Sequence, residues 1–335
     1  MMFGRALRAG AVIVCVLAAS GARAESIKIG VSKILGYGSI AIAQDKGYFH
    51  DQGLETELVN FDSAQPIAVA AVSGAIDFGI AGATAGLYSL AGQGALKIIA
   101  GSVRELPGFH NIAFLASNKA YAAGMVSFKD LGGHSVAITQ IGTPLHYALG
   151  RLVEKYGVDL ASIRVMALQS NTNVNSALVG GQVDAAAFAV TPALPLIERG
   201  EVKLMGWVGD EVPGLPGAVL FTQTRIADER ADTVKRFLKA YRRGARDFHD
   251  AFVGPDEQRH DGFLAPSILA ILAKFAGLTQ AQAALAIPYV DPDGRLDIKG
   301  VLAQIEWYKS QNLLKGQVDG NAVIDRRYVI ALPEG

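Results

Sequence analysis

Glycine, hydroxyl and amide residues stand where predicted strands end and predicted helices begin. Gly36 and Gly38 lie in the segment GYGSIA, Thr143 in TQIGTPLHYAL, and Asn171 and Thr172 in SNTNVNSAL. The first backbone N–H groups of a helix have no intrahelical acceptor, so such junctions can hold an anion or a polar ligand. The same residue types are also typical helix N-caps. Ligand binding and capping therefore both remain open for these positions.

Residues suited to catalysis or metal binding form no recognisable constellation. Asp77 and Asp184 are a candidate carboxylate pair, but each precedes a predicted buried strand, which favours a turn-stabilising role. The 6 histidines show no metal-binding spacing, and the sequence has neither a Gly-x-Ser-x-Gly elbow nor a phosphate-binding loop. GYGSIA fits the dinucleotide fingerprint poorly because its first glycine does not follow the strand directly. We expect no catalytic residue, no metal and no cofactor.

The N-terminus predicts export. Arginines precede an apolar run from Ala9 to Ala19, and an Ala-Arg-Ala triplet ends at Ala24. Residues 1–24 are therefore predicted to be a cleaved signal peptide, since the run is too short to span a bilayer as a helix. The 1 cysteine, Cys15, lies inside it, which excludes disulfides, thiolate metal sites and cysteine nucleophiles from the mature chain. We expect a periplasmic protein.

Charge argues against nucleic acid as a partner. The chain has 31 Lys+Arg and 31 Asp+Glu, and residues 1–24 hold three arginines and no acidic residue. The mature chain is thus faintly acidic. A protein without a basic field does not attract nucleic acid or an anionic membrane.

The pattern of residues 26–82 predicts a βαβαβ unit, with strands at 26–32, 54–61 and 76–82 and helices between them. The unit recurs 107 residues later: Ser63, Ala70, Val72, Gly74 and Asp77 correspond to Ser170, Ala177, Val179, Gly181 and Asp184. Alternating strands and helices build mainly parallel sheets, which bind ligands beyond the carboxyl ends of their strands. Two similar α/β halves facing a common cleft are therefore predicted.

The segments AQDKGYFHDQGLETELVNF, VSGAIDFGIAG, VSFKDLGGHSVAITQIGTPLHYALGRLVEKYGVD, LVGGQVDAAAF and IEWYKSQNLL together carry a resemblance. In this order they resemble the periplasmic substrate-binding proteins of ABC importers, in the branch for sulfonates, taurine, nitrate and pyrimidine precursors. The resemblance implies the two-lobed, type II periplasmic-binding-protein fold, an α/β fold with two hinge crossings, placed at 111–117 and 218–223. Lobe 1 would comprise 25–113 and 221–335, and lobe 2 would comprise 114–220.

The candidate ligand-binding residues lie in the loops of both predicted lobes. They are Ser32, Gly36, Tyr37, Gly38, Ser63, Gly82, Thr84 and Arg104 in lobe 1, and Thr139, Gly142, Thr143, His146, Asn171, Thr172, Phe188 and Thr191 in lobe 2. Arg104 and Lys33 are the cationic candidates for an anionic ligand. Tyr37, Phe188 and Trp207 are the candidates for an apolar wall.

The function expected from these observations is capture of a small organic anion, a sulfonate or a carboxylate, aromatic or aliphatic, by lobe closure. The resemblance implies delivery to the membrane permease of an ABC importer, and we expect a monomer. Nitrate or a thiamine pyrimidine precursor remains an alternative ligand, and a ligand-sensing module for a membrane receptor is an alternative role. A biosynthetic enzyme of the same fold is disfavoured, because the pyrimidine-making relatives carry a cysteine-rich motif that the mature chain lacks.

Overall fold

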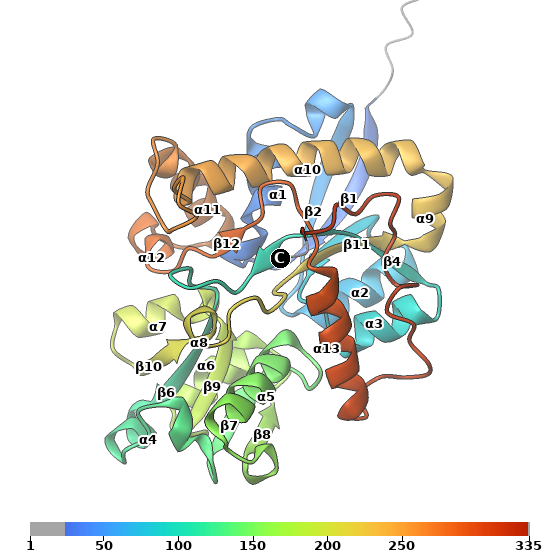
Figure 1. The fold of residues 1–335 in the computed structure, drawn as a ribbon. Helices are drawn as coiled ribbons and strands as arrows, with labels where there is room; N and C mark the ends of the chain where they lie inside the picture. The colour runs from blue at the N-terminus through green and yellow to red at the C-terminus, as the bar shows by residue number, and fades with distance from the viewer. Residues whose placement is uncertain (1–23, 334–335) are drawn as a thin grey trace, which may run out of the picture.

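The computed structural model describes residues 24–333, which form two α/β lobes, each built on its own sheet (Figure 1). The predicted signal peptide, except for Ala24, lies outside the described residues. Between residues 24 and 333, no helix has the length and apolar character needed to cross a bilayer.

The first lobe contains a five-stranded sheet in the order β2-β1-β3-β11-β4. β1 runs parallel to β2 and β3, whereas β11 runs antiparallel to β3 and β4. The strands are β1 (Glu25–Val31), β2 (Leu54–Asn60), β3 (Phe78–Ala81), β4 (Leu96–Gly101) and β11 (Val219–Gln223). The helices are η1 (Leu35–Tyr37), α1 (Gly38–Asp45), η2 (His50–Gln52), α2 (Ala64–Ser73), α3 (Ala85–Gly92), α9 (Thr224–Glu229), α10 (Ala231–Phe252), α11 (Ala265–Ala276), α12 (Gln280–Ala284) and α13 (Ile298–Ser310).

The second lobe contains a five-stranded sheet in the order β10-β6-β9-β7-β8. Its strands are β6 (Ile112–Ser117), β7 (Ser135–Ile138), β8 (Arg164–Ala167), β9 (Ala185–Ala189) and β10 (Val202–Trp207). Its helices are α4 (Asn118–Ala122), η3 (Phe128–Leu131), α5 (Pro144–Tyr156), η4 (Leu160–Ser162), α6 (Asn171–Val179), η5 (Thr191–Ala193), α7 (Leu194–Glu198) and α8 (Val208–Glu211). A separate two-stranded sheet pairs β5 (Val103–Arg104) with β12 (Tyr289–Val290).

In each sheet one inner strand is formed by the chain just after it arrives from the other lobe. β6 follows the first crossing of the chain and β11 follows the return crossing, and each runs antiparallel to both of its neighbours. The predicted crossings at 111–117 and 218–223 thus correspond largely to these strands, while residues 105–111 and 208–218 connect the two sheets.

The strand register confirms the internal repeat. Ile29 lies opposite Phe78 where β1 meets β3, and Val136 lies opposite Ala185 where β7 meets β9. Val136 follows Ile29 by 107 positions, and Ala185 follows Phe78 by the same 107 positions. The two lobes therefore share one βαβαβ plan and place equivalent loops toward each other.

The repeated aspartates anchor strands. Asp77 Oδ2 accepts a hydrogen bond from the backbone N–H of Lys28 at 2.8 Å, and Asp184 Oδ2 accepts one from the N–H of Ser135 at 2.8 Å. Lys28 and Ser135 are themselves equivalent in the repeat. These carboxylates therefore have a structural role, but they bind the neighbouring strand, whereas the sequence predicted that they stabilise a turn.

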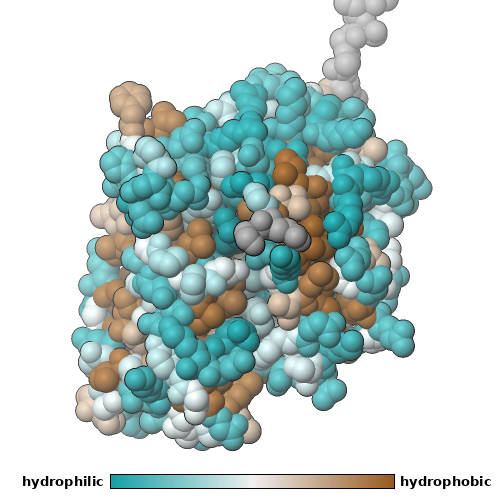
Figure 2. Space-filling model, in the orientation of Figure 1, coloured by the Kyte–Doolittle hydropathy of each residue, from teal (hydrophilic) through white to brown (hydrophobic). Residues whose placement is uncertain are grey.

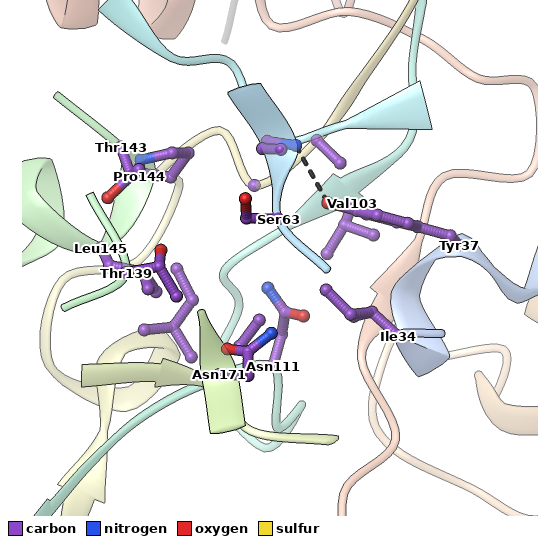
Figure 3. A pocket seen from close by; sticks show the side chains of 16 residues that line it. Ile34, Tyr37, Ser63, Val103, Asn111, Thr139, Thr143, Pro144, Leu145 and Asn171 are labelled. Carbon is purple, nitrogen blue, oxygen red and sulfur yellow. Dashed lines mark hydrogen bonds between the residues drawn. The ribbon is translucent and has the colours of Figure 1, made fainter. Parts of the chain in front are cut away.

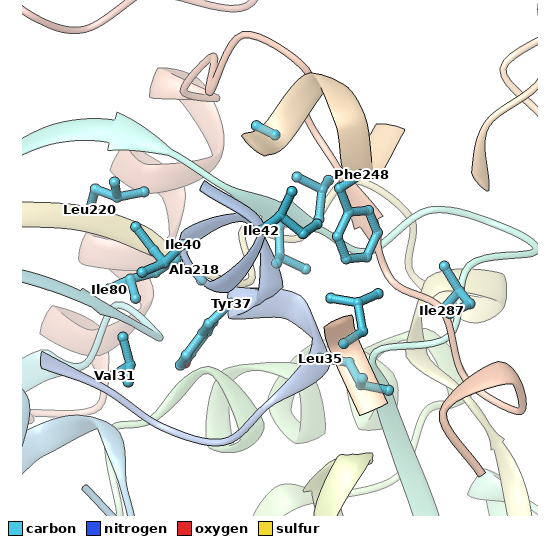
Figure 4. Close-up of a cluster of buried hydrophobic side chains, with 14 of the residues drawn as sticks. Val31, Leu35, Tyr37, Ile40, Ile42, Ile80, Ala218, Leu220, Phe248 and Ile287 are labelled. Carbon is cyan, nitrogen blue, oxygen red and sulfur yellow. The ribbon is translucent and has the colours of Figure 1, made fainter. Parts of the chain in front are cut away.

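Aromatic packing holds α10 on the first sheet. The Phe237 ring stacks on Phe78 at a centroid distance of 4.0 Å and on Phe49 at 5.6 Å. Nearby, Ile40 and Ile42 of α1 join residues of β1, β3 and β11 in a continuous apolar cluster (Figure 4). Figure 2 shows hydrophilic residues over most of the outer surface of α10, as its alternating basic and apolar sequence predicts.

Helix α13 connects the two lobes although it comes from the C-terminal part of the chain. The Trp307 ring meets His146 and Tyr147 of α5 edge-on, at centroid distances of 5.2 and 5.4 Å. On the other side, Tyr88 of α3 donates a hydrogen bond to Gln304 at 2.7 Å. A side chain at Gly150 would collide with Trp307, so this glycine permits the close approach of α5 and α13.

We expect Phe237→Ala to lower the free energy of unfolding by about 3–5 kcal/mol, because it removes a fully buried ring. Phe263 is 99% exposed, and Phe263→Ala should change stability by less than about 0.5 kcal/mol. Urea denaturation followed by circular dichroism measures both. Equal losses in the two variants would contradict this packing.

Candidate ligand-binding site

Direct hydrogen bonds join the lobes on both sides of the space between their sheets. The Leu35 N–H donates to Thr191 Oγ1 at 3.0 Å, and the Ala85 N–H donates to the Gly142 carbonyl at 2.7 Å. Asn171 Nδ2 donates to the Asp62 carbonyl at 3.1 Å. The structure therefore has its lobes in contact, in a closed arrangement.

A cavity lies between these contacts and is walled by both lobes (Figure 3). Its wall combines apolar side chains with neutral polar ones, and among residues 24–333 no carboxylate, lysine, arginine or histidine side chain lines it. The lining residues are Ile34, Tyr37, Ser63, Ala64, Gly82, Val103, Asn111, Ile112, Thr139, Thr143, Pro144, Leu145, Asn171, Ala189, Gly217 and Ala218. We call this space the central cavity.

Tyr37 forms part of the wall and is locked in place by its hydroxyl group. Its Oη accepts a hydrogen bond from the Gly82 N–H at 2.9 Å, and burial raises the pKa of Tyr37 to about 12. The phenol is thus neutral at physiological pH. Gly82 itself lies against Pro144, where a Cβ atom would crowd the ring of the proline.

Two hydroxyl groups in the wall are open to a ligand. Ser63 is the N-cap residue of α2, yet its side chain makes no capping hydrogen bond. Thr139 follows β7, and its hydroxyl also has no partner among residues 24–333. In Figure 3 the side chains of Ser63 and Thr139 come from opposite lobes toward the same space.

Helix N-termini add backbone donors to the cavity. Ala64 begins α2, Pro144 begins α5 and Asn171 begins α6, and all three line the wall. Pro144 has no N–H, and Thr143 and Ser170 already cap the third N–H group of α5 and α6. The remaining N–H groups of these first turns lack intrahelical acceptors and lie at the electropositive end of the helix dipole. The site can therefore bind a negative or electron-rich group with neutral donors alone.

Thr143 and His146 have mainly structural partners. Thr143 Oγ1 accepts from the His146 N–H at 3.4 Å and donates to the Gln140 carbonyl at 2.9 Å, so it caps α5 while also lining the cavity. His146 Nδ1 accepts from the Gly142 N–H at 3.3 Å, and burial lowers the pKa of His146 to about 4. His146 is neutral near pH 7 and lies outside the wall.

The two cationic candidates do not reach the central cavity. Arg104 Nη2 lies 3.9 Å from Asp291, and its guanidinium covers the ring of Tyr289 at 5.0 Å. Lys33 is exposed and lines a neighbouring side cavity instead. An anionic ligand in the central cavity would therefore have no cationic side chain against it.

The structure distributes the other predicted residues over three places. Ser32, Thr172 and Thr191 line the side cavity, which shares Ile34 and Asn171 with the central one. Thr84 caps α3 and lines a third cavity beside Gln140 and Thr143. Of the full predicted set, Tyr37, Ser63, Gly82, Thr139, Thr143 and Asn171 come together in the central cavity.

Several predicted residues pack in the protein interior. A Cβ atom at Gly36 would meet Val103, and one at Gly38 would collide with Leu272, so these glycines permit close packing. Gly142 adopts a positive φ of 74° and precedes the α5 cap. Phe188 is 1% exposed in the core, and Trp207 stacks on His110 at 4.1 Å. Neither of these two rings lines the cavity.

Asn111 is the polar wall residue that the sequence did not single out. It stands at the start of β6, next to the chain crossing, where nothing distinguishes it from a loop asparagine. Gly217 and Ala218 were missed for the same reason, since they belong to a segment that connects the lobes, and Val103 lies in the short strand β5 just before the other one. Within residues 24–333 no group of three or more His, Cys, Asp or Glu side chains is placed to hold a metal ion.

Comparison with known proteins is consistent with this architecture. Residues 37–256 match a family described as "NMT1/THI5 like". A putative binding protein of Brucella abortus is 28% identical over 250 residues, which cover 69% of each chain.

Solved structures show the same fold. The alkanesulfonate-binding protein SsuA from Xanthomonas axonopodis pv. citri, bound to MOPS, aligns with a TM-score of 0.70 and 20% identity, over 89% of this chain and 97% of that one. The periplasmic nitrate-binding protein NrtA from Synechocystis PCC 6803 aligns with a TM-score of 0.66 and 13% identity, over 89% and 84%. The predicted type II periplasmic-binding-protein fold is thereby confirmed.

We expect Tyr37→Phe to lower the free energy of unfolding by about 1–3 kcal/mol, because it leaves the buried Gly82 N–H without its acceptor. The ring and its packing are unchanged. Chemical denaturation at pH 7 measures the loss. A variant as stable as the wild type would show that this hydrogen bond does not hold the wall.

Proposed function

Because the chain belongs to the NMT1/THI5-like family, we propose that it is the solute-binding component of an ABC importer. It captures one small molecule in the central cavity and presents the closed form to a membrane permease. The observation that carries this proposal is a neutral cavity walled by both lobes and closed by hydrogen bonds between them. No bond is made or broken in this role, and the chain acts as a monomer.

The ligand in this proposal is a small organic anion, a sulfonate or a carboxylate. Its anionic group lies among the hydroxyls of Ser63 and Thr139 and the helix N-termini, since charge-assisted hydrogen bonds to neutral donors are strong. Its carbon body lies against Ile34, Val103 and Leu145. The apolar part of the wall favours an organic anion over nitrate, which has no apolar body.

Lobe motion accompanies binding in this proposal. The lobe built on the first sheet and the lobe built on the second sheet rotate relative to each other about the connecting segments 105–111 and 208–218. Opening breaks the hydrogen bonds at Leu35, Ala85 and Asn171 and admits the ligand. The protein works in the periplasm after removal of residues 1–24.

A thermal-shift screen tests the function. Residues 25–335 are refolded to release any bound molecule and mixed with sulfonates, carboxylates, nitrate and thiamine pyrimidine precursors. A ligand present at 100 times its dissociation constant stabilises the fold by about 2.7 kcal/mol. We expect an organic anion to give the largest shift. If no compound in the panel raises the melting temperature, the proposal is contradicted. If only a pyrimidine precursor does so, that precursor replaces the anion as the proposed ligand.

Two variants of cavity residues test whether the ligand binds in the central cavity. Thr139→Val and Ser63→Ala each remove a hydroxyl and should weaken binding of the hit by about 1.5–3 kcal/mol, or roughly ten- to a hundredfold. Ser176 is exposed on α6, and Ser176→Ala is the matched control that should bind normally. Isothermal titration gives the three affinities. Wild-type binding by both cavity variants would move the site elsewhere.

A further inference from the structure

A buried carboxylate lies where the two lobes are connected. Glu105 is 0% exposed and begins the first connecting segment, directly after β5. A buried carboxylate without a cationic partner is uncommon, because its charged form loses hydration. A carboxyl group buried at this position therefore needs hydrogen bonds from the protein in place of water.

The backbone around Glu105 ties the two connecting segments together. The Glu105 N–H donates to the Leu215 carbonyl at 3.0 Å, and the Gly214 N–H donates to the Glu105 carbonyl at 2.7 Å. The Gly217 N–H donates to the Val103 carbonyl at 2.9 Å. The outgoing and returning chains therefore form a short ladder, which fixes Glu105 in the hinge.

The side chain of Glu105 reaches forward to the cavity wall. Its Oε1 accepts from Asn111 Nδ2 at 2.5 Å, and its Oε2 accepts from the Ile112 N–H at 3.3 Å. Asn111 and Ile112 both line the central cavity. Glu105 thus contacts the wall from behind without being part of it.

We propose that Glu105 is a positioning residue for the ligand: through Asn111 it sets which hydrogen-bonding groups the hinge presents to the central cavity, according to whether it carries a proton. An ionised carboxylate can only accept, so it holds the amide NH2 of Asn111 toward itself. A protonated carboxyl group can also donate, and then accommodates the amide oxygen of Asn111. Asn111 then presents its oxygen to the cavity when Glu105 is ionised and its NH2 group when Glu105 is protonated.

The surroundings of Glu105 place this change near neutral pH. Burial raises the pKa of Glu105 to about 7, partly offset by the hydrogen bonds from Asn111 and Ile112. The charge of Asp210 on α8 raises it further. Both forms of Glu105 are then populated under physiological conditions.

Few other charged groups face Glu105. In the return segment 208–218 the ionisable side chains are Asp210 and Glu211, and residues 106–112 contain one, His110. His110 stacks on Trp207, and burial lowers its pKa. Arg104, on β5, is turned toward Asp291 and the Tyr289 ring. Among the described residues Asp210 and His110 are therefore the neighbours to control for.

The consequence for binding rests on the proposed function. An anion against Asn111 is repelled by an ionised Glu105 behind the amide, and protonation removes that repulsion. By linkage, anion binding takes up a proton at Glu105, and affinity falls as the pH rises through 7. An affinity change of about tenfold corresponds to one pKa unit of coupling.

The free energy of unfolding should also depend on whether Glu105 is protonated. The pKa of Glu105 is higher in the folded chain than its ordinary 4.5. The stabilising contribution is then complete below pH 4.5 and is lost as the pH rises through about 7. Glu105→Gln keeps the shape and an acceptor for Asn111 but cannot ionise.

Nuclear magnetic resonance of the mature chain tests the positioning without any ligand. The side-chain amide signal of Asn111 is assigned by its loss in Asn111→Ser and followed from pH 5 to 8.5. We expect it to titrate with a midpoint near 7 in the wild type and in His110→Gln, and to stay constant in Glu105→Gln. Asp210→Asn should lower the midpoint. A signal that does not titrate, or that titrates equally in Glu105→Gln, would overturn the proposal.

Affinity measurements test the consequence for the ligand. The probes are ethanesulfonate and nitrate, whose charges are constant between pH 5.5 and 8.5. We expect the affinity of a bound probe to fall about tenfold over this range in the wild type and to be constant in Glu105→Gln. A wild-type affinity independent of pH would overturn the coupling. If neither probe nor any other anion binds, the anionic ligand of the proposed function is ruled out, while the Asn111 titration still decides the role of Glu105.

Discussion

The central cavity is walled, within the described part of the chain, by apolar and neutral polar side chains without a charged one, and the rest of the candidate site depends on this constraint. In the proposed function, hydroxyl groups and helix N-termini bind the ligand without help from a cation. Each of these donors is weak alone, and they act together only when both lobes surround the ligand. Ser63 belongs to one lobe and Thr139 to the other. The closed arrangement, held by bonds such as Leu35 to Thr191, is therefore the form in which the site is complete.

The internal repeat explains how the two halves of the site meet. Equivalent residues pair in both sheets, as Ile29 with Phe78 and Val136 with Ala185, and the equivalent Ser63 and Ser170 precede α2 and α6. Parallel strands place these junctions at their carboxyl ends, and two lobes turned toward each other then present helix N-termini to a common space. The C-terminal helices α9 to α13 have no counterpart in the second lobe, and α13 among them contacts both lobes.

The sequence predicted the fold well because its information is periodic and local. The alternation of strands and helices is a short-range pattern, and the repeat is the same short-range pattern occurring again 107 positions later. Of the candidate ligand-binding residues, Tyr37, Ser63 and Asn171 line the central cavity, whereas Phe188 and Gly38 pack in the core. Asn111 and Glu105 could not be found, since their roles arise from a hinge that pairs residues more than 100 positions apart in the chain.

The most direct test of the account is a crystal structure of residues 25–335 with the molecule that gives the largest thermal shift. We predict one ligand in the central cavity, with its anionic group within hydrogen-bonding distance of Ser63 and Thr139 and its carbon body against Leu145. A ligand bound outside this cavity, or one held by Arg104 or Lys33 instead of neutral donors, would contradict the account.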